Sequence, residues 1–140
     1  MDAINTVLPG MMERRQGRIV AIGGTYGHRG VARSSLYAAS KWALRGLIKS
    51  IAGEVGPFGI TANVVSPGGI DGENLRAQFA QSAQREGLTP DAVYDRFAAR
   101  SAMRTLVSGA DVAATVLYAV SSAAARVTGQ DLLVDAGTIL

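Results

Sequence analysis

The chain has 140 residues, 48% of them hydrophobic, and a formal net charge of +3. This size allows one globular domain with a buried core, and the dispersed charge, with Arg14 and Arg15 as its only adjacent basic pair, argues against nucleic-acid binding. The chain has no cysteine and His28 is its single histidine, which excludes thiolate and histidine-cluster metal sites. The absence of cysteine fits a reducing cytoplasm, and the short apolar runs argue against a membrane span.

The first third of the chain predicts a helix, a strand, a loop and a second helix. Residues 1–15 look like the end of a helix, and Gly17 to Gly24 are a β-branched apolar run typical of a strand in a parallel sheet. Residues 25–30 form a loop punctuated by glycines. The helix that follows is expected to begin near Ser34 or Ser35, either of which can cap it, and to end near Val55.

This second helix is apolar on more than one face. Trp42, Gly46 and Gly53 lie outside its main stripe, and each interior glycine costs about 1 kcal/mol relative to alanine. We therefore expect another backbone to approach Gly46 and Gly53, and the helix to pack on both its own sheet and a second surface. The main stripe follows i, i+3, i+4 spacing and comprises Leu44, Leu47, Ile48, Ile51, Ala52 and Val55.

The remaining elements predict an α/β fold. A second apolar strand runs from Gly59 and should end at Ser66, because Pro67 lacks the donor that a central strand needs. Residues 73–104 are more polar, with Thr89 before a proline as a helix-start signal, and are expected to form one or two mobile helices that act as a lid. A further helix over 111–121 and a last strand and turn over 129–137 complete a parallel sheet, whose polar residues follow the strands, where ligands bind.

Tyr37 and Lys41 are the candidate chemical groups of the second helix. Four residues apart, they share one helix face. An ammonium beside a phenol favours the phenolate and makes the tyrosine a better acid–base catalyst near neutral pH. The same pair is also compatible with a solvated helix surface.

Taken together, these segments resemble the short-chain dehydrogenase/reductase family over nearly the whole chain from about Leu8. The resemblance implies a partial Rossmann-type domain over residues 1–140, with part of a doubly wound parallel sheet, NAD or NADP as cofactor and a small-molecule alcohol or carbonyl as substrate. It also implies a homodimer or homotetramer through the helix of the YxxxK motif. The matching segments are Gly17 to Val20, Gly27 and Gly30, Tyr37 to Lys41, Asn63 with Pro67 and Gly68, and Gly129 to Gly137.

The resemblance also implies roles for individual residues. Tyr37 would be the general acid/base, and Lys41 would favour its ionised form and hydrogen-bond the cofactor ribose. Pro67, Gly68 and Ile70 would line the nicotinamide, Ile70 through its backbone. The hydride would come from the cofactor.

Three departures from the family pattern qualify this interpretation. Gly24 stands where the family has a serine, so that Thr25 or a backbone N–H is the candidate donor to the reacting oxygen; the alternative is that Thr25 only caps the turn. Gly72 replaces a threonine that contacts the carboxamide. The family's glycine-rich phosphate loop is missing, so we expect an inactive fragment. The alternative function is a non-catalytic association module or a decayed enzyme of the same fold.

Overall fold

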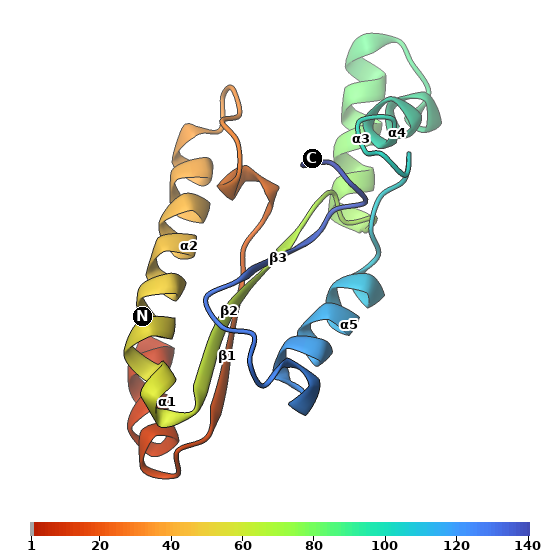
Figure 1. Ribbon diagram of the computed structural model, residues 1–140. Coiled ribbons are helices and arrows are strands. Elements are labelled where there is room, and N and C mark those ends of the chain that lie inside the picture. Colours follow the sequence, from red (N-terminus) through yellow and green to blue (C-terminus); the bar gives the residue numbers. More distant parts are fainter. Residues whose placement is uncertain (1) are drawn as a thin grey trace.

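The computed structural model describes residues 2–140 as a three-stranded parallel sheet with helices packed around it (Figure 1). The strand order is β1-β2-β3, and the order of elements along the chain is the predicted one. This confirms the α/β class with a parallel sheet. The elements are α1 Asp2–Glu13, β1 Gly17–Ile22, α2 Ser35–Val55, β2 Ile60–Pro67, α3 Glu73–Glu86, α4 Pro90–Ala98, α5 Gly109–Val120 and β3 Asp131–Val134, with short 3-10 turns η1 Thr25–Gly27, η2 Gly56–Phe58 and η3 Ser122–Ala124.

The core lies between β2 and α2. β2 is the central strand, and all eight of its residues are buried. α1 and α2 cover one face of the sheet and α5 covers the other (Figure 1). Burial on both faces explains why β2 is apolar along most of its length. The core cluster contains four members of the predicted α2 stripe and comprises Ile19, Ile48, Ile51, Ala52, Val55, Ile60, Ala62 and Val64.

β2 does not end at Ser66 as predicted but continues through Pro67. The backbone amides of Val64 and Gly68 donate toward β3, at 2.8 and 2.9 Å. Because residues in a parallel strand face alternate neighbours, Pro67 faces the β1 side. The last ladder pair on that side joins Ile22 to Val65, so the missing N–H of Pro67 removes no ladder hydrogen bond.

α2 has the predicted length but leaves one face open. Ser34 occupies the N-cap position, yet its side chain makes no cap hydrogen bond. Apart from the adjoining backbone of α2 itself, a Cβ added at Gly46 or Gly53 would meet nothing within 4 Å in residues 2–140, so the expected backbone approach is wrong for contacts within this chain. Leu36 and Trp42 are 87% and 49% exposed on the same helix.

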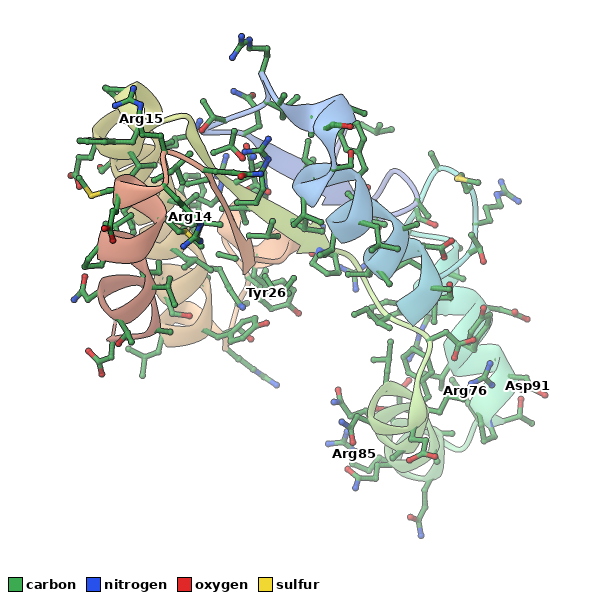
Figure 2. All side chains as sticks on the ribbon, turned by 90° about the horizontal axis from the view of Figure 1, so that it is seen from below. Arg14, Arg15, Tyr26, Arg76, Arg85 and Asp91 are labelled. Carbon is green, nitrogen blue, oxygen red and sulfur yellow. The ribbon has the colours of Figure 1, made fainter. Side chains whose placement is uncertain are left out.

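Residues 73–104 form two helices, α3 and α4, beyond the carboxyl ends of the strands (Figure 1). Thr89 caps α4 as predicted, and its Oγ1 accepts a hydrogen bond from the Ala92 amide at 3.2 Å. Figure 2 shows Arg76, Arg85 and Asp91 on this helix pair, apart from the sheet. The pair has its own small core of Phe79, Ala83 and Val93, against which Leu75, Tyr94, Phe97 and Leu106 pack. Across residues 2–140, the structure contains no helix with the length and apolar character needed to cross a membrane.

Candidate active site

A cavity of about 400 Å³ opens at the carboxyl ends of the three strands. Open parallel sheets bind their ligands at this edge. Of the predicted catalytic and cofactor-binding residues, Tyr37, Thr25, Pro67, Gly68 and Ile70 line the cavity and Lys41 does not. Its lining residues include Gly24, Thr25, Tyr26 and Arg29 after β1, Tyr37 of α2, Pro67, Gly68 and Ile70 at the end of β2, Leu75 and Gln78 of α3, Phe97 and Arg100 from the α4 region, and Asp135 after β3.

Tyr37 stands in the first turn of α2 and is 54% exposed, so solvent or a ligand can reach its hydroxyl. Its ring and the Tyr26 ring form a T-shaped pair, with centroids 5.5 Å apart. Tyr26 is labelled in Figure 2, where it projects from the loop after β1. A Cβ added at Gly24 would lie 3.9 Å from the Tyr37 hydroxyl oxygen. The hydroxyl therefore faces the glycine loop at the end of β1.

Lys41 lies one turn further along α2, on the face that carries Tyr37. Its ammonium donates a hydrogen bond to the Ile22 carbonyl oxygen at 3.1 Å and lies 5.5 Å from the centre of the Tyr37 ring. The i, i+4 spacing thus brings the two groups together as predicted. The last carbonyl of β1 holds the lysine in place.

Gly23 and Gly24 are both required, for different reasons. A Cβ at Gly23 would overlap the side chains of Val64 and Ser66. Gly24 has φ +156° and ψ 158°, a backbone conformation that is essentially confined to glycine. Its amide donates a hydrogen bond to Ser66 Oγ at 3.1 Å. Thr25 follows, 6% exposed at the cavity wall, and the N-cap of the η1 turn is Gly24 rather than Thr25.

The segment after β2 approaches the segment after β3 closely. A Cβ on Gly68 would lie 2.9 Å from the Asp135 Cα, so only glycine fits there. Ile70 is 38% exposed and forms an isolated bridge with Val107. Gly72 is the N-cap of α3 and provides no side-chain cap.

Asp71, beside this segment, forms an exposed bidentate ion pair with Arg76. Their oxygen–nitrogen distances are 2.6 and 2.7 Å. The hydrogen bonds from Arg76 hold the pKa of Asp71 below its ordinary value of 3.8. The pair therefore ties the start of α3 to the loop that follows β2.

His28, Asp131 and Arg45 form a group behind the cavity wall that the sequence did not indicate. Asp131 Oδ2 lies 3.0 Å from His28 Nε2 and 2.7 Å from Arg45 Nε. Arg45 also donates to the Gly27 carbonyl oxygen. These contacts fix the loop of residues 25–30 to α2 and β3. His28 is separated from Asp131 by 103 positions, and no local pattern links them.

Asn63, part of the motif that the sequence singled out, has a structural place away from the cavity. It is fully buried in β2, where its Nδ2 donates to the Val127 carbonyl oxygen at 2.7 Å and its Oδ1 accepts from the Gln130 amide at 3.0 Å. Asn63 therefore positions the turn into β3. In the described part of the chain, no group of three His, Asp or Glu side chains is placed to hold a metal ion.

Comparison with known proteins yields one family. The family profile described as enoyl-(acyl carrier protein) reductase matches residues 1–138. The 3-oxoacyl-(acyl-carrier-protein) reductase FabG of Salmonella typhimurium is 37% identical over 131 residues, which cover 94% of this chain and 49% of that protein. The chain thus spans about half the length of the curated relatives it matches.

Two solved structures have the same fold over about half their length. Actinorhodin polyketide ketoreductase with NADPH, a variant form, is 34% identical with a TM-score of 0.84 and is matched over 92% of this chain and 49% of its own. A 3-oxoacyl-(acyl-carrier protein) reductase with bound NAD from Brucella melitensis is 28% identical with a TM-score of 0.78, over 99% of this chain and 47% of its own. The profile match, the relatives and the shared parallel fold all agree: the chain belongs to the short-chain dehydrogenase/reductase family.

Proposed function

We propose that this chain carries the proton-transfer site of an NAD- or NADP-dependent oxidoreductase that interconverts an alcohol and a carbonyl. The observation that carries the proposal is the exposed Tyr37 hydroxyl at the cavity wall, with the Lys41 ammonium one turn away and anchored to the Ile22 carbonyl. The relatives are named as 3-oxoacyl reductases and a ketoreductase, which favours carbonyl reduction as the direction.

In the reductive direction Tyr37 donates its phenolic proton to the carbonyl oxygen of the substrate. The nicotinamide cofactor supplies the hydride that reaches the carbonyl carbon. The carbonyl thereby becomes an alcohol, and Tyr37 is left as a phenolate that takes a proton from solvent. The Lys41 ammonium stabilises this phenolate by its charge. In the oxidative direction Tyr37 accepts the proton instead.

Thr25 is the proposed second donor to the reacting oxygen. It lies next to Gly24 in sequence, is nearly buried and lines the same cavity as Tyr37. A donor aimed at an oxygen that gains negative charge stabilises the transition state. Its hydroxyl would therefore act where the family has a serine.

The cavity also fits the nicotinamide end of the cofactor. A Cβ at Gly24 would come within 3.8 Å of the Pro67 carbonyl oxygen and 3.9 Å of the Tyr37 hydroxyl, so the missing side chain leaves open the space between them. We propose that Pro67, Gly68 and Ile70 border the nicotinamide, while Tyr37 and Lys41 bind the ribose. The structure favours neither NAD nor NADP.

The 140-residue chain by itself is proposed to be inactive. In residues 2–140 no strand leads into a helix through the spaced glycines that bind a dinucleotide pyrophosphate. Titration calorimetry of this chain with NAD(H) and NADP(H) is expected to show no micromolar binding. Micromolar binding would contradict the proposal that the chain lacks its adenosine-side contacts.

Residues 73–104 are proposed to act as a lid over the substrate. Leu75 and Gln78 of α3, Phe97 of α4 and Arg100 line the cavity from this side. Helices that close over a bound substrate exclude water from the reaction. The separate small core of α3 and α4 allows them to move as a unit.

The open face of α2 supports a proposal about assembly. Leu36 and Trp42 are exposed, and no other segment of residues 2–140 lies within 4 Å of a Cβ added at Gly46 or Gly53. Exposed apolar surface of this kind usually marks an interface. We propose a homodimer or homotetramer that packs through α2. If the catalytic proposal fails, this face favours a non-catalytic association module as the alternative function.

The proposed chemistry is tested with Tyr37→Phe in the protein as its genome encodes it. The variant keeps the ring and removes the exchangeable proton, so kcat is expected to fall by about 10²–10⁴. Tyr118→Phe is the matched control, because Tyr118 is also exposed but lies on α5, on the other face of the sheet. A Tyr37→Phe enzyme that retains more than about a tenth of the rate would assign proton transfer to another group.

A further inference from the structure

Two arginines line the cavity from different walls. Arg29 belongs to the loop between η1 and α2, and Arg100 follows α4. In the part of the chain that the structure describes, neither forms an ion pair. The Nε of Arg29 is buried without a hydrogen-bond partner. A buried donor without an acceptor is unfavourable, and a bound ligand that supplies the acceptor removes this cost.

The described lining of the cavity carries more positive than negative charge. Asp135 is the acidic residue among its described lining residues. Its Oδ1 accepts a hydrogen bond from the Gly137 amide at 2.9 Å, and its Oδ2 accepts one from the Ile139 amide at 2.8 Å. Both oxygens are thus committed to the turn after β3. Two arginines against one carboxylate leave an excess of positive charge that attracts an anion.

Arg100 lies over an aromatic ring of the cavity wall. Its guanidinium carbon lies 5.2 Å from the centre of the Phe97 ring, and Phe97 lines the same cavity. A guanidinium in cation–π contact with a ring still has N–H groups available for a second partner. These donors match the paired oxygens of a carboxylate or a phosphate.

We infer that the substrate carries an anionic group, a carboxylate or a phosphate, which Arg29 and Arg100 bind while its carbonyl or hydroxyl reaches Tyr37. The inference rests on the proposed function for the reacting end of the substrate. The cavity of about 400 Å³ lies at the small end of the range for ligand sites and is shared with the nicotinamide, so it suits a short oxoacid or a short phosphorylated carbonyl compound. Arg29 and Arg100 are therefore specificity-determining residues of the site.

The test measures binding of unreactive anions, so that it does not depend on catalysis. Calorimetry with the protein as its genome encodes it uses succinate as the carboxylate probe, glycerol 3-phosphate as the phosphate probe and dimethyl succinate as the neutral control. Arg29→Gln and Arg100→Gln are each expected to weaken anion binding about 10- to 100-fold, the size of a lost charge-assisted hydrogen bond. Arg126→Gln is the matched control, because Arg126 is exposed and precedes β3, at the other end of the sheet.

Each outcome decides between the possibilities. Binding of one probe that falls with ionic strength and with either arginine variant supports the inference and identifies carboxylate or phosphate as the group. The inference is overturned if neither anion binds, if dimethyl succinate binds as well as succinate, or if the arginine variants bind like wild type. Displacement of the anion by NADP⁺ also overturns it, by assigning the arginines to the cofactor. Anion binding in a protein without reductase activity would refute the proposed function and leave standing only the assignment of Arg29 and Arg100 as an anion site.

Discussion

Asp131→Asn is expected to destabilise the protein by about 2–3 kcal/mol and to loosen the loop that borders the cavity. The Asp131 side chain is 6% exposed, and its partners His28 and Arg45 are 12% and 21% exposed. Removing one partner of a buried ion pair costs about 3–5 kcal/mol. We expect a smaller loss of stability here because the Arg45 side chain is partly exposed to solvent and because asparagine can still accept a hydrogen bond.

Urea unfolding measures the effect directly. With a urea dependence of about 2 kcal/mol/M, the midpoint should fall by roughly 1–1.5 M. Amide hydrogen exchange in residues 25–30 should become faster, because His28 and the Gly27 carbonyl are the loop's attachments to Asp131 and Arg45. Asp71→Asn is the matched control: it breaks a bidentate pair of similar length in solvent and should leave the midpoint nearly unchanged. A midpoint for Asp131→Asn within about 0.3 M of wild type would refute the reasoning, by showing that desolvation offsets the attraction.

Three further changes test other parts of the structure. Thr25→Val in the protein as its genome encodes it is expected to lower turnover by about 10²–10³, and unchanged turnover would assign the contact with the reacting oxygen to backbone or water. Gly46→Glu should reduce the mass measured by light scattering from an oligomer to a monomer, and an unaltered mass would exclude this face of α2 as the interface. Hydrogen bonds from the Ser108 amide and hydroxyl lower the pKa of Asp111 below its ordinary 3.8, so its stabilising effect is present above that value and is lost as pH falls through the folded-state pKa. Asp111→Asn should therefore lower the thermal midpoint at pH 7 but not in strong acid, and an equal loss at both would contradict this account.

The sequence predicted the elements whose signals are local. The apolar spacing of α2 and the buried run of β2 reflect periodicities that short segments carry by themselves. The Tyr37–Lys41 pair followed from the same helical spacing. The predicted end of β2 was wrong by one residue, because the effect of Pro67 on the strand depends on which neighbouring strand its nitrogen faces. That information lies in the sheet rather than in the strand.

Other features depend on contacts between distant segments. Arg29 and Arg100 lie 71 positions apart in the sequence (100 − 29), and only the fold brings both to one cavity. The close approach expected at Gly46 does not occur within the chain, because a glycine in a helix indicates available space but not the segment that fills it. Asn63 is a similar case. The sequence identified it as part of a family motif but did not indicate its hydrogen-bond partners at the turn into β3.

The adjacent glycines at the end of β1 have a consequence for how this site can be altered by mutation. A serine at position 24 would have to adopt the backbone angles of Gly24, which only glycine tolerates. A single Gly24→Ser substitution would therefore also require a different backbone conformation of the loop. Position 25 is different, because Thr25 is not among the residues with positive φ and already faces the cavity. For protein engineering, Thr25→Ser is therefore the accessible route to a serine hydroxyl in this site. Random mutagenesis should recover functional variants at position 25 well before any at 23 or 24.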